Sequence, residues 1–205
     1  VRVMTETLGT RHHDIRFDTP ELVQALVPAT EARDLPGMAD VDSSLWLFCR
    51  EIKKKATVGL SGECADEIFG GYPWFHNERM VNSNGFPWIA SLTERTRVLK
   101  REIIDYIRPE EYARNRYNET LAETPRLPGE NPMEARRREI FYLNIRWFMS
   151  TLLDRKDRMS MAHGLEVRVP YCDHRLAQYV WNVPWDLKTM GDREKGLLRK
   201  ALEGL

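Results

Sequence analysis

The sequence has few cysteines, and none of them are spaced as in a metal site or a redox motif. Its 205 residues contain three cysteines, Cys49, Cys64 and Cys172, which lie far apart along the chain. An odd and scattered set of this kind excludes a disulfide framework and a zinc site. We therefore expect the protein to function in a reducing, cytoplasmic compartment.

Long apolar runs and a surplus of one charge are also absent. No stretch approaches the roughly 18 apolar residues that span a bilayer, so we expect no membrane-spanning helix. The 31 basic and 31 acidic side chains balance, and this argues against a nucleic-acid binder, which needs a basic surplus. Hydrophobic residues make up 42% of the chain and charged residues 30%, as in ordinary globular domains.

Signals for helices and strands alternate in the first third of the chain. Residues 12–17 alternate polar and apolar side chains and predict a short strand. Apolar residues from Leu45 to Ile52 recur at helical spacing and predict a helix, for which residues 42–44 offer N-cap side chains. Residues 57–60 are β-branched or apolar and predict a buried strand. A strand that directly follows a helix favours a parallel sheet.

The remainder of the chain has mostly helical signals. Residues 93–107 and 134–161 carry long helical patterns, and residues 125–132, which include three prolines, predict a loop. We therefore expect an α/β fold in residues 1–72, in which helices flank a parallel sheet. A mostly helical lobe is expected in residues 73–205.

Carboxylates cluster directly after the predicted strand at residues 57–60. Ser61 and Gly62 form a small, flexible turn, and Glu63, Asp66 and Glu67 follow at offsets that place them on one face of a helix. Acids of this kind also occur at ordinary helix starts. In open α/β sheets, however, ligands bind beyond the carboxyl ends of strands. An acidic loop repels phosphate unless a cation such as Mg²⁺ bridges them, so the pattern favours a Mg²⁺–nucleotide or Mg²⁺–pyrophosphate site.

Two glycines, Gly70 and Gly71, end this predicted helix after barely two turns. A helix so short between flexible ends is expected to add little to a hydrophobic core. We therefore interpret it as an element that directs side chains into a cleft.

The acidic segment also resembles a known family signature. Residues 61–72, SGECADEIFGGY, resemble the second signature of asparagine synthetases and related ATP-pyrophosphatase-type ligases. Residues 36–44, 155–170 and 193–202 fit the same family in the same order, so that the resemblance covers nearly the whole chain. It implies an adenine nucleotide alpha-hydrolase-like fold, here with a truncated sheet.

The resemblance implies that Mg·ATP activates aspartate to β-aspartyl-AMP and that ammonia, released from glutamine in a separate domain, then attacks the acyl-adenylate. Ser61 and Gly62 would contact the AMP portion. Glu63 would accept a proton beside the acyl centre, and Asp66 would hold Mg²⁺ and pyrophosphate. The positions implied near the aspartate substrate are Asp42, Ser43 and Ser44.

Two basic residues, Arg155 and Lys156, are candidates for stabilising phosphate charge. An equally good interpretation is a surface ion-pair cluster with the neighbouring acids at positions 154 and 157. Glu166 and Arg168 lie two residues apart, and we expect them to form a structural salt bridge.

The sequence departs from the family pattern in several places. Cys64 stands where the family's loop has a glycine. The family's S-G-G-x-D-S phosphate-binding loop does not occur in these residues, nor do the N-terminal glutaminase domain and a lysine beyond the last helix. The chain is expected to be a truncated part of the enzyme, to associate as a homodimer through exposed apolar surface, and not to make asparagine alone.

Two alternative functions fit part of the same pattern. A related ligase that amidates or cyclises another carboxylate, such as a β-lactam synthetase, would share the nucleotide loop and differ in the substrate pocket. A non-catalytic helical interaction module with a decayed nucleotide motif would not bind Mg·ATP tightly.

Overall fold

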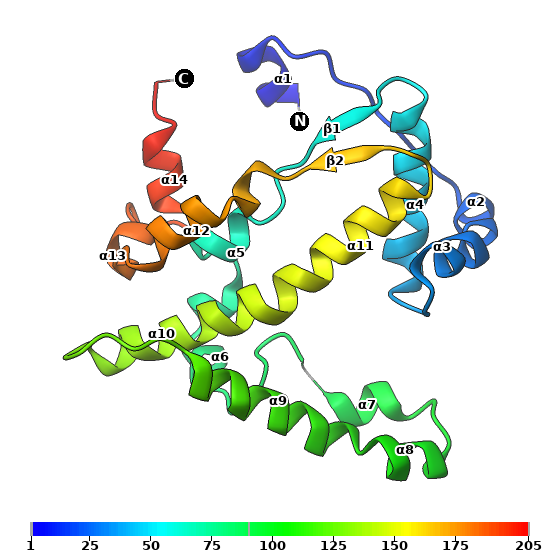
Figure 1. Cartoon of the computed structure of the whole chain (residues 1–205). Coiled ribbons are helices and arrows are strands. Elements are labelled where there is room, and N and C mark those ends of the chain that lie inside the picture. Colours follow the sequence, from blue (N-terminus) through cyan, green and yellow to red (C-terminus); the bar gives the residue numbers. More distant parts are fainter. Residues whose placement is uncertain (1, 90, 205) are drawn as a thin grey trace. The chain divides into compact units, whose positions relative to one another are not determined.

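The structure, a computed structural model, describes residues 2–89 and 91–204, with only the backbone described at Ala39 and Asp40 (Figure 1). It contains two compact units, which are described separately. Unit 1 comprises the residues up to Leu60 and Leu153–Arg168, and unit 2 comprises Ser61–Leu152 and the residues from Val169 onward. The predicted division at residue 72 stays a prediction. None of the described helices is both long and apolar enough to cross a membrane.

Unit 1 contains several helices and a small sheet. The helices are α1 (Arg2–Leu8), α2 (Thr19–Gln24), α3 (Leu26–Arg33), α4 (Ala39–Lys53) and the C-terminal part of α11 (Ser150–Met161). Helix α2 begins with a capping box, in which the Asp18 carboxylate accepts from the Glu21 amide and Glu21 accepts from the Asp18 amide. Helix α4 packs against α2 and α3 and buries Leu47 and Cys49.

The predicted parallel sheet is confirmed, and in the described chain it has two strands. Strand β1 (Val58–Leu60) pairs with β2 (Glu166–Arg168), with Gly59 opposite Val167, and the two arrows lie side by side in Figure 1. The prediction that the first strand is buried is wrong, because Leu60 is 78% exposed. The predicted strand at residues 12–17 is also wrong: this segment forms no ladder, and alternation alone does not supply a pairing partner.

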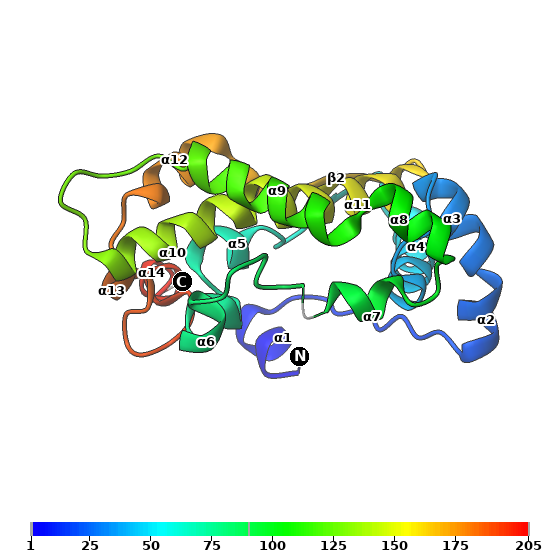
Figure 2. The same cartoon turned by 90° about the horizontal axis from the view of Figure 1, so that it is seen from below.

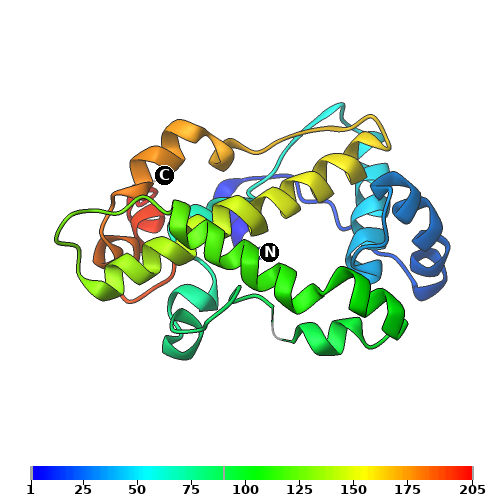
Figure 3. The same ribbon diagram turned by 60° about the horizontal axis from the view of Figure 1, so that its bottom comes forward.

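Unit 2 is mostly helical, as expected. Its elements are α5 (Ala65–Phe69), η1 (Pro73–Phe75), α6 (Glu78–Val81), α7 (Leu92–Thr96), α8 (Arg101–Ile107), α9 (Pro109–Glu123), α10 (Pro132–Leu143), η2 (Asn144–Met149), η3 (Pro170–Cys172), α12 (His174–Trp181), α13 (Trp185–Lys188) and α14 (Gly196–Ala201). Figure 2 shows α13 beside α14, and Figure 3 shows the predicted loop that joins α9 to α10. The long helix predicted at residues 93–107 is divided into α7 and α8.

Helix α5 forms part of the core of unit 2, which contradicts the interpretation that a helix so short adds little to a core. Ile68 is fully buried, and Ala65 and Phe69 are almost as inaccessible. The helix packs against η2, η3, α12 and α14, all of which come from later parts of the sequence. The φ of +71° at Gly70, a left-handed conformation that glycine adopts readily, ends the helix. This packing fixes the position of the acidic segment that leads into α5.

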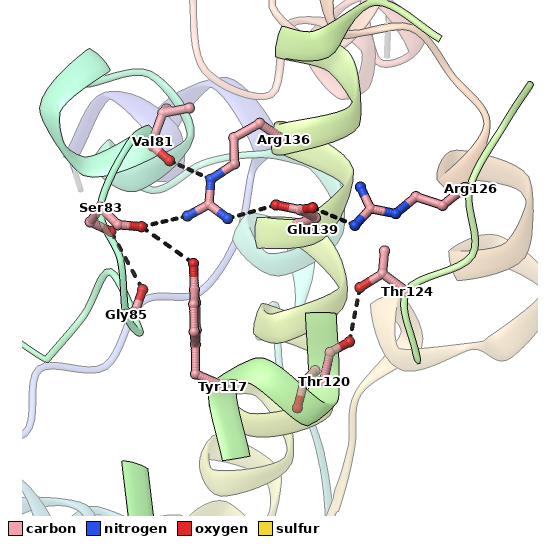
Figure 4. Close-up of polar contacts among 9 residues, drawn as sticks. All are labelled: Val81, Ser83, Gly85, Tyr117, Thr120, Thr124, Arg126, Arg136 and Glu139. Carbon is pink, nitrogen blue, oxygen red and sulfur yellow. Dashed lines mark hydrogen bonds and ion pairs between the residues drawn. The ribbon is translucent and has the colours of Figure 1, made fainter. Parts of the chain in front are cut away.

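A half-buried arginine, Arg136, attaches the loop after α6 to helix α10 (Figure 4). The Arg136 guanidinium donates to the carbonyl oxygens of Val81 at 2.7 Å and Ser83 at 2.6 Å, and to the Glu139 carboxylate at 2.7 Å. The Tyr117 hydroxyl donates to the same Ser83 carbonyl at 3.3 Å. Burial lowers the pKa of Arg136, but the hydrogen bond to Glu139 and the neighbouring Tyr117 outweigh it, so that the net shift is upward. The guanidinium therefore stays charged and holds the loop.

Candidate functional site

The candidate loop begins with Ser61, which directly follows β1 in the chain, as the sequence predicts. The Ser61 hydroxyl accepts a long hydrogen bond of 3.4 Å from the Glu63 amide and so shapes the turn. Gly62 is exposed, and a Cβ built on it would meet no atom within 4 Å. The backbone at Gly62 is therefore accessible to a ligand, as a role in contacting AMP requires.

Cys64 adopts a backbone conformation that favours glycine. Its φ of +71° lies in the left-handed region, and it is the N-cap residue of α5 although its side chain makes no cap hydrogen bond. The residue is fully buried. Burial raises the pKa of its thiol, and the neighbouring Cys172 and Glu67 raise it further, so Cys64 is not poised as a nucleophile. The left-handed backbone gives a physical reason for the glycine of the family pattern at this position.

We expect Cys64→Gly to be more stable than Cys64→Ala by about 1 kcal/mol, because only glycine adopts this φ without a steric cost. Both variants remove the thiol, so the difference between their stabilities reports the steric cost of the left-handed backbone conformation. Urea unfolding followed by circular dichroism measures the difference. Equal stabilities, or a more stable alanine variant, would show that the left-handed turn is not strained.

The three carboxylates of the segment differ in accessibility. Glu63 and Asp66 are half-buried, whereas Glu67 is buried and its carboxylate accepts a hydrogen bond of 2.7 Å from the Tyr72 hydroxyl. Burial raises the pKa of Glu67, although the hydrogen bond from Tyr72 acts in the opposite direction. The Asn144 amide donates to the Glu67 carbonyl at 3.3 Å and ties α5 to η2. Glu67 is thus part of the core, whereas Glu63 and Asp66 are only half-buried.

Asp66 has a basic partner that the sequence analysis did not single out. Its Oδ1 lies 2.7 Å from the Lys195 ammonium, and a Cβ at Gly71 would collide with the same carboxylate. Lys195 belongs to the motif at residues 193–202, but nothing in its local pattern shows that it meets Asp66.

The carboxylate of Asp66 is suited to a magnesium ion that binds together with a nucleotide. No group of three or more His, Cys, Asp or Glu residues suited to a metal occurs within residues 2–89 and 91–204, so these residues form no preformed metal cage. Mg²⁺ needs only one or two protein carboxylates when phosphate oxygens and water complete its shell. The half-buried carboxylate of Asp66 meets that requirement.

The predicted substrate residues of unit 1 lie within helix α4 and not at its start. Helix α4 begins at Ala39, and the N-cap role predicted for residues 42–44 is therefore wrong. Asp42 is buried, and both of its carboxylate oxygens accept from the Arg33 guanidinium at 3.2 Å. Gly37 leaves room for this carboxylate, since a Cβ there would collide with it. The Asp42 carboxylate therefore has a structural partner, and its contact with substrate stays a prediction.

Ser43 and Ser44 differ in their surroundings. Ser43 is buried, whereas Ser44 is half-buried and donates to the Val41 carbonyl at 3.0 Å. Ser44 and Arg155 line one surface pocket of about 360 Å³ in unit 1, together with Ile15, Phe17, Val41, Leu45 and Phe48. The structure thus brings together one predicted substrate residue and one predicted phosphate-binding residue.

Ion pairs with neighbouring acids involve only some of the basic residues of α11. Asp154 pairs with Arg158 at 2.8 Å, and Arg158 also pairs with Asp34. The Nε atom of Arg155 is buried without a hydrogen-bond partner. The role of Arg155 and Lys156 in phosphate binding stays a prediction. The predicted salt bridge between Glu166 and Arg168 is confirmed at 2.8 Å, but both side chains are exposed, so it adds little stability.

Taken together, the fold and the site define an α/β protein with an accessible polar loop directly after a parallel strand. Ligands of such proteins bind beyond the carboxyl ends of the strands. The loop supplies an open glycine and two half-buried carboxylates, one of them beside a lysine.

Comparison with known proteins identifies the family. A family model described as asparagine synthase matches residues 1–205, and the chain therefore belongs to the asparagine synthase family. Asparagine synthetase (glutamine-hydrolyzing) 3 of Bacillus subtilis strain 168 is 57% identical over 205 residues, which are all of this chain and 33% of that relative. Asparagine synthetase (glutamine-hydrolyzing) 1 of the same strain is 29% identical over 198 residues, 78% of this chain and 30% of that relative. The asparagine synthetase (glutamine-hydrolyzing) of Bos taurus is 25% identical over 207 residues, 98% of this chain and 28% of that relative.

The chain spans about a third of the length of the curated relatives it matches. These relatives are all named as glutamine-hydrolysing asparagine synthetases. Neither the β-lactam synthetase-like ligase nor the non-catalytic module is favoured by these matches.

Proposed function

We propose that the chain is the part of a glutamine-dependent asparagine synthetase that binds Mg·ATP and aspartate. What carries the proposal is the 57% identity to a Bacillus subtilis asparagine synthetase over all 205 residues. In this proposal the carboxylate of aspartate attacks the α-phosphorus of ATP, which gives β-aspartyl-AMP and releases pyrophosphate. Ammonia then attacks the acyl carbon, and asparagine and AMP leave.

The loop after β1 would bind the nucleotide. The exposed backbone of Gly62 and the Ser61 hydroxyl would contact the AMP portion. Asp66 would hold Mg²⁺, which neutralises phosphate charge when it is bound, and Lys195 beside it would contact phosphate oxygens. Glu63 would accept the proton that the attacking ammonia loses. The half-buried positions of Glu63 and Asp66, in contrast to the buried Glu67, support this assignment.

Residues of unit 1 would contact aspartate and the phosphate groups of ATP. The pocket lined by Ser44 and Arg155 supports a role in anion binding, because the guanidinium of Arg155 is cationic. We assign Asp42, Ser43 and Ser44 to the aspartate side and Arg155 and Lys156 to the phosphate side. In this proposal residues 1–72 are a partial nucleotide-binding region of an adenine nucleotide alpha-hydrolase-like fold, and residues 73–205 are its helical lobe.

Other parts of the enzyme would complete the reaction. The phosphate-binding S-G-G-x-D-S loop and the glutaminase that releases ammonia are not among these residues. We propose that they lie in the remaining two thirds of the protein, as the length of the relatives suggests. A homodimer and a cytoplasmic location also belong to this proposal.

The test is a chimera in which these 205 residues replace the matching third of Bacillus subtilis asparagine synthetase 3. We expect the chimera to form asparagine from aspartate, ammonia and Mg·ATP, because it would combine this chain with the segments it lacks. The Bacillus parent is the positive control, and the isolated chain is expected to be inactive. A folded chimera without activity, alongside an active parent, would contradict the proposed function.

A further inference from the structure

Lys188, the last residue of α13, is a buried lysine in unit 2. Only 2% of its surface is exposed. Its ammonium nitrogen lies 4.5 Å from the centre of the Phe141 ring and 4.9 Å from that of the Trp185 ring. Within the part of the chain that the structure describes, no acid forms an ion pair or a hydrogen bond with it. The two rings stabilise the ammonium, but a buried cation without an anion remains costly.

The acids nearest to Lys188 already have other partners. Glu130 forms an ion pair with Arg138 at 2.6 Å, and Glu134 forms one with Arg137 at 3.2 Å. Burial lowers the pKa of Lys188 to about 8, and Arg138 lowers it further, whereas Glu134 acts in the opposite direction. The two ion pairs therefore leave the charge of Lys188 uncompensated.

A pocket of about 480 Å³ lies at this place in unit 2. Lys188 and three aromatic residues, Phe141, Trp181 and Trp185, belong to its lining, as do the two ion pairs. A third acid of the lining, Asp186, is exposed, so that solvent screens its charge. A concave site of this size, with aromatic walls and a few polar groups, is typical of a pocket for a small molecule.

We infer that this pocket, named the Lys188 pocket, binds a small molecule that carries one carboxylate on a flat apolar body. The carboxylate compensates the charge of Lys188 through a charge-assisted hydrogen bond, and the aromatic residues contact the apolar body. A phosphate dianion fits less well, because its charge exceeds that of one ammonium and it offers the rings no apolar surface. None of the residues assigned above to ATP, Mg²⁺ or aspartate lines the Lys188 pocket, so the inference does not depend on the proposed function.

The first experiment compares benzoate with benzamide, a neutral molecule of the same shape. In calorimetric titrations of the 205-residue chain, we expect one benzoate to bind with a dissociation constant of about 1 mM or lower, which a ligand of this size can reach. Benzamide should bind about tenfold or more weakly, because it lacks the charge that Lys188 recognises. Equal affinities, or no benzoate binding, would overturn the inference.

Two lysine variants test the role of the ammonium. Lys188→Met keeps an unbranched side chain of similar length between the rings and removes the charge, so the preference for benzoate over benzamide should disappear. The matched control is Lys200→Met, which removes an exposed lysine of α14 and should keep the preference. A Lys188→Met chain that still prefers benzoate contradicts the inference. If this variant does not fold, the comparison of the two probes on the unaltered chain decides.

Amide hydrogen exchange locates the bound benzoate. Exchange should slow in residues 134–141 and 181–189, which line the Lys188 pocket, and stay unchanged in residues 61–66. Slower exchange in residues 61–66 alone would place benzoate in the candidate loop and refute the inference. The same titration of the chimera should give the same preference for benzoate. Its loss there would show that the rest of the enzyme covers the pocket, against the inference.

Discussion

Replacing Glu63 with glutamine should lower the rate of asparagine formation by the chimera by about 100-fold or more, the typical contribution of a general base. Glutamine matches glutamate in size but cannot accept the proton that ammonia releases on forming the amide. Because this proton transfer follows activation, exchange of labelled pyrophosphate into ATP in the presence of aspartate should persist. The measurements are asparagine formation and pyrophosphate exchange on the same preparation.

The matched control is Glu67→Gln, which changes another acid of the same segment. Burial raises the pKa of Glu67, and a glutamine carbonyl can still accept the hydrogen bond from Tyr72. We therefore expect only a small loss of activity from this variant. Equal losses from the two variants would remove the catalytic assignment of Glu63, as would a Glu63→Gln chimera of normal rate.

Replacing Arg136 with methionine should lower the free energy of unfolding of unit 2 by about 1–3 kcal/mol, the usual cost of leaving hydrogen-bonding groups without their partner. The variant leaves the carbonyl groups of Val81 and Ser83 without the guanidinium and removes one of the two arginines that pair with Glu139. Most tryptophans of the chain lie in unit 2, so fluorescence in a urea titration follows this unit.

Arg101→Met provides the control for this prediction. Arg101 also pairs with a carboxylate, that of Asp105 at 3.0 Å, but its side chain is 82% exposed. We expect a change of no more than about 0.5 kcal/mol, as for other exposed pairs. If Arg136→Met costs no more than this control, the network of Figure 4 does not stabilise the unit.

The parts of the fold that depend on local signals could be predicted from the sequence. The apolar segment at residues 57–60 predicted a strand of a parallel sheet, and Gly70 predicted the end of α5. The single helix predicted at residues 93–107 is interrupted in the structure. There the Thr96 hydroxyl bonds to the carbonyls of Leu92 and Thr93, and the helix does not continue.

The parts that depend on contacts between remote segments could not be predicted. The burial of α5 comes from η3, α12 and α14, which lie far along the sequence. For the same reason the pair Asp66–Lys195 left no local signal. Among the site residues, the sequence identified the half-buried acids Glu63 and Asp66 but did not separate them from the buried Glu67, because burial is set by tertiary packing.

The most direct test of the central claim follows the oxygen atoms of aspartate in the chimera. If the chain activates aspartate as an acyl-adenylate, an ¹⁸O atom from the β-carboxylate stays on the phosphorus when ammonia displaces AMP. We therefore predict that AMP formed from β-¹⁸O-labelled aspartate carries one ¹⁸O atom, seen by mass spectrometry. Asparagine formed with unlabelled AMP, or with the label in inorganic phosphate, would contradict the account.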